Sequence, residues 1–85
     1  MRALMLSTLL AAMALPALAA ERCDVPKDKW RPVAELESTL TAKGWTIKKV
    51  KTEDGCYEVY GKDEHGKRVE IFFDPATFAE MGSDD

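Results

Sequence analysis

Residues 45–61 of the chain read WTIKKVKTEDGCYEVYG, and this stretch decides the fold. Asp54-Gly55 is a two-residue hairpin signal, because both residue types tolerate the positive φ values that a tight hairpin turn requires. On either side of the turn lie segments rich in β-branched and aromatic residues, which favour strands. We therefore expect an antiparallel hairpin with strands at residues 45–52 and 56–61.

The first of these strands does not alternate cleanly between apolar and polar residues. A tight turn pairs Val50 with Val59, but Trp45 and Ile47 have the opposite parity to Val50. A one-residue bulge at the two lysines that follow Ile47 would bring all three apolar side chains to the same face. We expect this bulge, because without it Trp45 and Ile47 would lie exposed on the outer face of the sheet.

A third strand is expected at residues 67–74, after a polar turn. Pairing Val59 with Val69 would place the apolar side chains of both strands on one face. The same register would place Glu58 beside Glu70 on the opposite, solvated face. We interpret these carboxylates as part of a screened polar surface rather than as a catalytic pair.

The segment before the hairpin carries apolar residues at helical spacing. They are Trp30, Val33, Leu36 and Leu40. Spacings of three and four predict an amphipathic helix at residues 31–43, whose apolar stripe packs on the sheet. Pro32 suits the first turn of this helix, and Gly44 suits its C-terminal cap.

The end of the chain is predicted to be helical. Asp74-Pro75 has the pattern of a helix N-cap followed by a helix-compatible proline, and Phe78 and Met81 could form a small apolar face. Residues 83–85 should fray. The predicted fold class is therefore α+β: one amphipathic helix packed on a three-stranded antiparallel sheet, in the order α-β-β-β, with a short C-terminal helix.

Residues 1–19 have the pattern of an export signal. Arg2 supplies the positive start, an apolar run follows at 4–15, and small residues end the segment. We expect cleavage between Ala19 and Ala20, with the next bond as the alternative. An uncleaved membrane anchor is the other interpretation, although the run is shorter than the about 20 residues that a span requires. The mature protein would then have no membrane span and would be periplasmic or secreted.

The two cysteines, Cys23 and Cys56, both lie in the predicted mature chain. In an oxidising compartment an even pair is typical of a structural disulfide, and their spacing fits neither a CxxC redox motif nor a zinc site. Two free thiols or a reactive pair are the alternatives. A bridge would tie an extended arm at residues 20–29 to the folded domain at 30–82, which is small enough to need such a cross-link.

The composition excludes several classes of function. The net charge is −3 and the basic residues form no continuous stripe, so nucleic acid is not an expected partner. The chain has no phosphate-binding loop, dinucleotide fingerprint or nucleophile motif, and its one histidine, His65, lies in a polar turn. We therefore expect no enzyme, no catalytic residue, no metal ligand and no cofactor.

Three aromatic residues are candidates for binding a partner. Trp30 and Trp45 could each anchor an interface, because tryptophan is enriched at binding hot spots. Both also lie in register with apolar elements, so burial in the core is the favoured interpretation of each. Tyr60 is expected on the outer face of the sheet, where it could contact a partner.

Several stretches together match a known pattern: Trp30, GWTIKKV at 44–50, DGCYEVY at 54–60, GKRVE at 66–70 and Asp74-Pro75. In these residues the chain resembles the PepSY-like small exported proteins, in particular a cysteine-bearing subgroup related to peptidase propeptides. The resemblance implies a helix on a small antiparallel sheet and a non-catalytic role as an inhibitor or folding aid. The family often has Thr-Gly after the Asp-Pro, whereas this chain has Thr77-Phe78, which favours a helical ending over an additional strand.

We therefore expect an exported, non-catalytic binding module that is regulatory or protease-modulating. Its expected partner is another periplasmic or membrane-anchored protein, which would dock at a sheet edge or on the outer sheet face. Two alternatives stay open. One is a small periplasmic carrier of a metal or ligand at Asp63, Glu64 and His65, and the other is a thiol–disulfide active protein that uses its cysteine pair.

Overall fold

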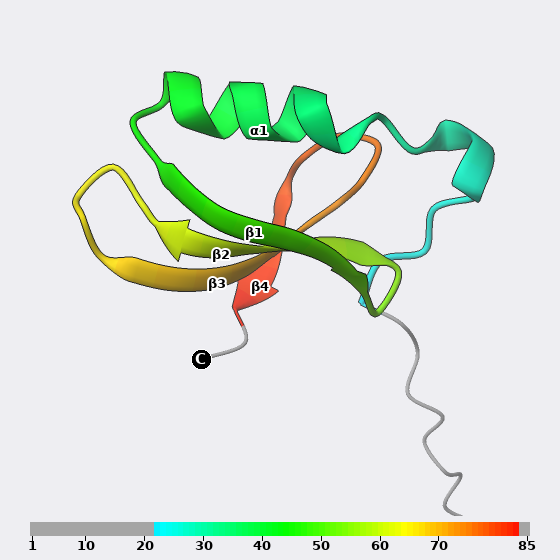
Figure 1. Ribbon diagram of the computed structural model, residues 1–85. Helices are drawn as coiled ribbons and strands as arrows, with labels where there is room; N and C mark the ends of the chain where they lie inside the picture. Colours follow the sequence, from blue (N-terminus) through cyan, green and yellow to red (C-terminus); the bar gives the residue numbers. More distant parts are fainter. Residues whose placement is uncertain (1–21, 84–85) are drawn as a thin grey trace, which may run out of the picture.

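The computed structural model describes residues 22–83, so the predicted signal peptide, its cleavage bond at Ala19 and Ala20, and the last two residues lie outside the described part. The elements are a 3-10 turn η1 (Lys27–Lys29), a helix α1 (Val33–Ala42) and strands β1 (Thr46–Glu53), β2 (Cys56–Lys62), β3 (Arg68–Phe73) and β4 (Glu80–Ser83). The strands form one antiparallel sheet in the order β1-β2-β3-β4, with α1 across one face (Figure 1). The predicted α+β class is confirmed, but the sheet has four strands rather than three.

Helix α1 is positioned by the residues at its two ends. It begins after Pro32, which is the N-cap residue, and it ends before Gly44, whose φ of 99° is the left-handed conformation that glycine adopts without strain. Leu36 and Leu40 are buried on the face toward the sheet. The core that they enter also contains Trp45, Tyr57, Val59, Val69 and Phe73.

The β1–β2 hairpin has the predicted turn and the predicted bulge. Asp54 and Gly55 both have positive φ, at 60° and 74°. Val50 pairs with Val59 as expected, and the register shifts between Ile47 and Lys49. The bulge turns Trp45 and Ile47 toward the core, so the first part of β1 and the part after the bulge bury the same face.

The register between β2 and β3 differs by two residues from the predicted one. Val59 pairs with Ile71, and Val69 lies opposite Gly61. The reason is the loop between the strands, where a side-chain oxygen of Asp63 accepts hydrogen bonds from the backbone N–H groups of His65 (2.9 Å) and Lys67 (3.0 Å). This capping holds residues 63–67 as a loop, so pairing resumes only at Arg68. Because the register shifts by two residues, the side chains of β3 stay on the predicted faces of the sheet.

The register shift also corrects the predicted position of Glu58. It lies opposite Phe72 rather than Glu70, with Lys51 as its partner on β1. Its side chain is 0% exposed, so the prediction of a solvated face is wrong at this position. Glu58 and Glu70, which were expected side by side, are therefore not cross-strand partners, and Glu58 does not belong to a screened polar surface.

The predicted C-terminal helix is replaced by a turn and strand β4. A side-chain oxygen of Asp74 accepts hydrogen bonds from the N–H groups of Ala76 (2.8 Å) and Thr77 (2.9 Å), and these bonds lower the pKa of Asp74, the Thr77 bond contributing most. The N–H of Asp74 in turn donates to the carbonyl oxygen of Ala79 at 2.8 Å. Aspartate here closes a turn instead of starting a helix. The chain then reverses and pairs with β3.

Phe78 occupies the strained position of this turn. Its φ is 65°, a conformation that is rare for a bulky residue, and its ring packs against the core with the guanidinium of Arg31 at 4.0 Å from the ring centroid. Phe78 thus occupies a left-handed position at which glycine would be free of strain, and the ring contacts offset the backbone strain.

Replacing Phe78 separates these two effects. Phe78→Gly and Phe78→Ala both remove the ring, but only alanine keeps the backbone strain. We expect Phe78→Gly to be the more stable of the two by about 1 kcal/mol in urea unfolding. At an ordinary position glycine is the less stable residue, so an alanine variant equal to or better than the glycine variant would contradict the argument.

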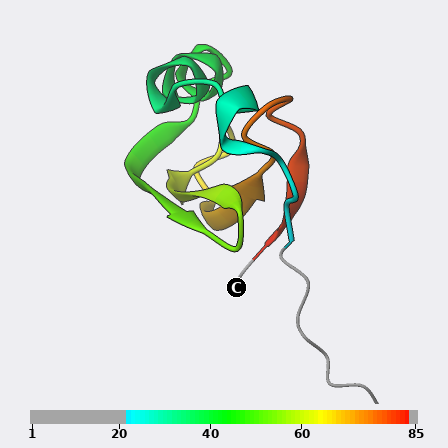
Figure 2. The same ribbon diagram turned by 90° about the vertical axis from the view of Figure 1, so that its right-hand side faces the viewer.

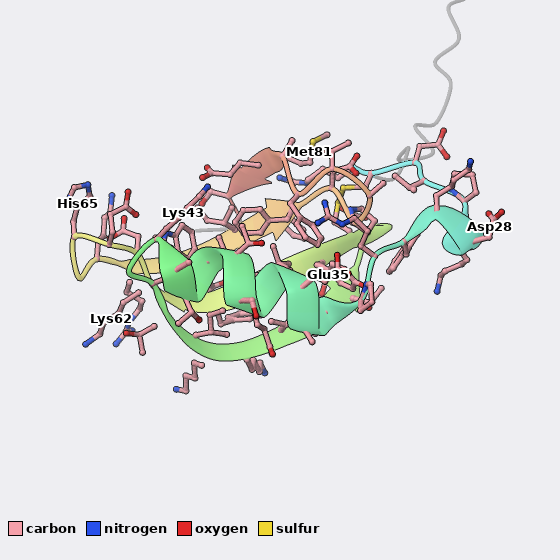
Figure 3. All side chains as sticks on the ribbon, turned by 90° about the horizontal axis from the view of Figure 1, so that it is seen from above. Asp28, Glu35, Lys43, Lys62, His65 and Met81 are labelled. Carbon is pink, nitrogen blue, oxygen red and sulfur yellow. A yellow bond between two sulfur atoms is a disulfide. The ribbon has the colours of Figure 1, made fainter. Side chains whose placement is uncertain are left out.

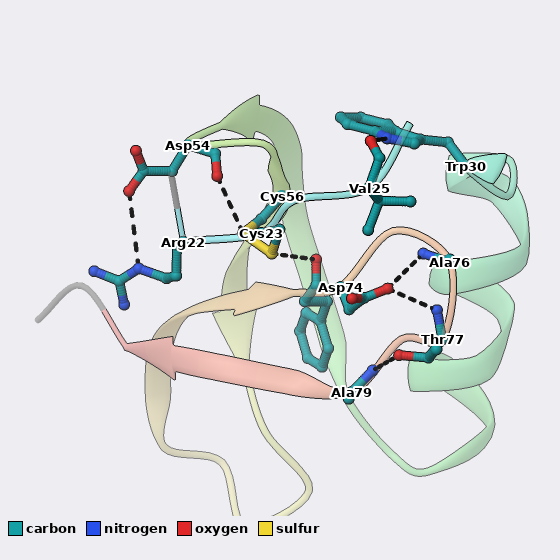
Figure 4. Close-up of a disulfide and its surroundings, with 11 residues drawn as sticks. Arg22, Cys23, Val25, Trp30, Asp54, Cys56, Asp74, Ala76, Thr77 and Ala79 are labelled. Atoms are coloured by element: carbon teal, nitrogen blue, oxygen red, sulfur yellow. Dashed lines mark hydrogen bonds and ion pairs between the residues drawn. A yellow bond between two sulfur atoms is a disulfide. The ribbon is translucent and has the colours of Figure 1, made fainter. Parts of the chain in front are cut away.

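The sheet face opposite α1 is covered at one end by the N-terminal arm. Cys23 and Cys56 form the predicted disulfide, with an S–S distance of 2.00 Å. Figure 4 shows this bridge between the N-terminal arm and the sheet. The backbone N–H of Cys23 donates to the carbonyl oxygen of Asp54 at 3.1 Å, and both cysteines form a buried cluster with Phe72. Figure 2 shows the arm descending from η1, and the side chain of Arg22 at its start reaches Gly82 of β4. The arm predicted as extended is interrupted by η1 before it reaches the helix.

Candidate interaction surface

The sheet face away from α1, here called the outer face, follows from the strand register. Side chains alternate between the two faces of a strand, and Val50, Val59 and Ile71 mark the face that packs on the helix. The outer face is therefore formed by Thr46, Lys49, Lys51 and Glu53 of β1, Cys56, Glu58, Tyr60 and Lys62 of β2, and Arg68, Glu70 and Phe72 of β3.

The disulfide end of the outer face is closed. Phe72 is buried beneath the disulfide, and the guanidinium of Arg22 lies 4.2 Å from the centroid of its ring. Arg22 also approaches Asp54, with 3.8 Å between the guanidinium Nε and the carboxylate Oδ2. These contacts cover the apolar part of the face around Phe72, so this part is not available to a partner.

The opposite end of the outer face is a hollow of about 570 Å³ beside the bulge of β1. Its lining includes Lys48, Tyr60, Gly61, Lys62, Arg68 and Glu70. Figure 3 shows Lys62 and His65 at this end of the molecule, with Asp28 at the other. We call this depression the basic hollow, because three of the six residues named are cations.

Gly61 allows β1 and β2 to approach each other at the bulge. A Cβ atom at this position would clash with the backbone carbonyl oxygen of Thr46 and the Cα atom of Ile47. Only a residue without a side chain fits beneath the bulged strand, which explains glycine in the interior of a strand where it is otherwise unfavourable. The bulge and the glycine together shape the basic hollow.

Tyr60 lies at the centre of the exposed part of the outer face. The Nζ atoms of Lys49 and Lys51 lie 5.0 and 5.5 Å from the centroid of its ring. The pKa of Tyr60 is raised, first by burial and further by Glu58, while Lys51 acts in the opposite direction. The pKa of Lys51 is raised as well, mainly by its hydrogen bond to Glu53, with 3.1 Å between Nζ and Oε1. Tyr60 therefore stays neutral and Lys51 stays charged.

The structure does not bring the three aromatic candidates together. Trp45 is 8% exposed and packs edge-to-face on Phe73 in the core. Trp30 is half-buried beside Tyr57, and its Nε1–H donates to the carbonyl oxygen of Val25 at 2.8 Å. Of the three, only Tyr60 lies on the outer face beside the basic hollow.

The polar turn at Asp63, Glu64 and His65 has a structural role in the loop. One carboxylate oxygen of Asp63 accepts two backbone hydrogen bonds, which lower the pKa of this group, with the bond from Lys67 the larger cause. His65 is exposed, and its Nε2 lies 3.9 Å from an oxygen of Glu64. Within residues 22–83, no cluster of three or more His, Cys, Asp or Glu side chains could hold a metal ion.

Sequence reasoning missed the basic hollow because of the register error. With the predicted pairing, Arg68 would lie beside Tyr60, as an ordinary surface contact. In the structure Arg68 lies opposite Lys62, and Tyr60 lies opposite Glu70. The signal that could have found this was Asp63, because an aspartate four residues before Lys67 can cap a loop of this length.

Comparison with known proteins gives one family. The family model described as peptidase propeptide and YPEB domain (PepSY_2) matches residues 3–83. No match was found among curated proteins or among solved structures. Between residues 22 and 83, no helix combines the length and the apolar character needed to cross a membrane.

Proposed function

Because the chain belongs to the peptidase propeptide and YPEB domain family, we propose that it is an exported, non-catalytic module that binds and regulates a protein partner, with a peptidase as the first class to test. The family membership supports a propeptide-like role. The disulfide between Cys23 and Cys56 supports export, because such bridges persist in oxidising compartments. The partner would be a periplasmic, secreted or membrane-anchored protein.

The observation that carries the proposal is the free edge of β1. This strand is eight residues long and, in the described part of the chain, pairs with a strand on one side only. An unpaired strand edge presents backbone N–H and C=O groups to which a partner segment can add as a further strand. Strand β4 is the other edge, but its four residues offer a shorter template.

Inhibition of purified peptidases tests the proposal. The oxidised protein is titrated into exported peptidases of the serine and metallo classes, and hydrolysis of a peptide substrate is followed. We expect loss of hydrolysis in at least one class, saturating at one equivalent of protein. If no peptidase of either class binds or is inhibited, the peptidase assignment is wrong.

Variants at Lys48 test whether β1 is the docking edge. Lys48 is the bulge residue and has no cross-strand partner in the register, so proline is tolerated there while its missing N–H blocks strand addition. We expect Lys48→Pro to abolish inhibition and Lys48→Gln, which removes the charge but keeps the backbone N–H, to inhibit more strongly than Lys48→Pro. Met81→Pro on β4 serves as the control for the other edge. Equal inhibition by all three variants would exclude docking at β1.

Two other functions have less support from the structure. In a thiol-active protein the disulfide would have to react with an incoming thiolate. Cys23 is 2% exposed and Cys56 is 0% exposed, so a thiolate cannot reach either sulfur unless the surrounding structure first opens. In the carrier alternative, Asp63 would have to give up backbone hydrogen bonds that hold its loop.

A further inference from the structure

We propose that the basic hollow binds an extended acidic segment of the partner polypeptide, with carboxylate side chains of that segment contacting Lys48, Lys62 and Arg68. The inference deepens the proposed function and rests on it only in that the partner is a polypeptide. It names the chemistry of the partner segment and places it on the outer face beside β1.

The distribution of charge is the first argument. The whole chain has a net charge of −3. The lining of the basic hollow has the opposite sign, because Lys48, Lys62 and Arg68 face the single carboxylate of Glu70. Lys49 and Lys51 lie directly beside it around Tyr60. A positive surface on an acidic protein is complementary to an acidic partner and directs its approach.

The pairing of Lys62 with Arg68 is the second argument. These two cations lie directly opposite each other on neighbouring strands, an arrangement that destabilises a sheet. Within residues 22–83 neither of them forms an ion pair with a carboxylate. Lysines on an edge strand protect against aggregation, but β2 and β3 are the inner strands of this sheet. A binding role explains why the repulsion is kept.

The shape of the basic hollow is the third argument. Gly61 contributes no side chain to it, and the bulge moves the backbone of β1 aside. Tyr60 adds an aromatic surface next to the cations, and its neutral hydroxyl can donate a hydrogen bond to a carboxylate. The volume of about 570 Å³ lies in the range of sites that accept small ligands or a few side chains.

The position of the basic hollow favours a polypeptide over other anions. Lys48 belongs to both the hollow and the free edge of β1. A strand added to that edge would run along the bulge, and every second side chain of the strand would point to the outer face. Carboxylates on that side of the added strand would meet the cations. A lipid surface or a nucleic acid would not use the backbone groups of an edge.

Fluorescence anisotropy with defined peptides tests this inference. The probe is a short fluorescein-labelled peptide of alternating glutamate and threonine, and the matched probe has glutamine in place of glutamate. The test variant is Lys48→Gln/Lys62→Gln/Arg68→Gln. The control variant, Lys27→Gln/Lys29→Gln/Lys43→Gln, makes the same change in net charge at residues that do not line the hollow. If the test variant fails to fold by circular dichroism, Arg68→Gln alone replaces it.

We expect the glutamate peptide to bind, the glutamine peptide not to bind, and added salt to weaken binding. The test variant should bind at least about tenfold more weakly, while the control variant keeps its affinity. Equal losses in the two variants, or equal binding of the two peptides, would overturn the inference. Tighter binding of anionic phospholipid vesicles or of a uridine oligonucleotide, lost in the same variant, would also overturn it. A peptidase that is inhibited equally by wild type and test variant would leave the proposed function standing and reject the hollow alone.

Discussion

Removing the disulfide through the double variant Cys23→Ala/Cys56→Ala is expected to lower the free energy of unfolding by about 3–4 kcal/mol. The bridge closes a loop across a sequence separation of 33 residues, and the chain-entropy model gives this magnitude for such a loop. For a domain of this size the melting temperature should fall by about 15–30 °C. Alanine is the suitable replacement, because a serine hydroxyl would be buried beside Phe72.

Thermal melts of the wild type and the variant, followed by circular dichroism, measure this loss. The spectrum at low temperature should stay close to that of the wild type, since α1 and the core on the opposite face do not contain the bridge. Reduced wild type should melt near the variant. An unchanged melting curve would show that the bridge contributes nothing, and a random-coil spectrum at all temperatures would show that the remaining core cannot fold alone.

Gly61→Ala is the substitution with the second largest expected effect. A methyl group at this position has no room, because the backbone of β1 lies against it at the bulge. Backbone atoms cannot move aside as a flexible side chain can, so we expect a loss of about 2–3 kcal/mol, at the upper end for overpacking. The free edge of β1 and the basic hollow should be disrupted together, and binding at either should weaken.

Urea unfolding and hydrogen exchange measure this effect, with Gly66→Asn as the matched control. Gly66 has a φ of 78° and no atom within 4 Å of a Cβ placed on it, so asparagine has room there and meets only the backbone strain of the left-handed conformation, which asparagine adopts more often than most residues. Backbone amides of β1 should exchange faster in the Gly61 variant and not in the control. Similar losses of stability in both variants would mean that the packing beneath the bulge is looser than the structure shows.

The sequence predicted those parts of the fold that depend on neighbouring residues. Asp54-Gly55 determined the hairpin, and the misplaced parity of Trp45 and Ile47 required the bulge that is found. The periodicity of the apolar residues predicted the helix, and an even pair of cysteines predicted the bridge. For the hairpin, the bulge and the helix, the residues that carry the pattern are the residues that form the element. For the disulfide, a chain with two cysteines allows only one intramolecular pair.

The errors arose where one side chain has two possible roles. Asp63 could be a solvated turn residue or a cap, and as a cap it shifts the register of β3 by two residues. Asp74 could start a helix or close a turn, and Phe78 was not expected to adopt a positive φ. The burial of Glu58 could not be predicted either, because it depends on tertiary packing that no local pattern reports. The basic hollow follows from that register and was missed with it.

The order of the strands in the sheet has a consequence for how the molecule assembles. Each strand pairs with the strand next to it in the chain, so the domain is a meander of low contact order whose hairpins close through short, entropically inexpensive loops. Contacts between distant parts of the chain include the Cys23–Cys56 disulfide and the hydrogen bonds that link Arg31 to Pro75 and to Tyr57. We therefore expect local strand pairing to precede oxidation. Because the chain has two cysteines, a single intramolecular bridge is possible, and no disulfide isomerase is needed to select it.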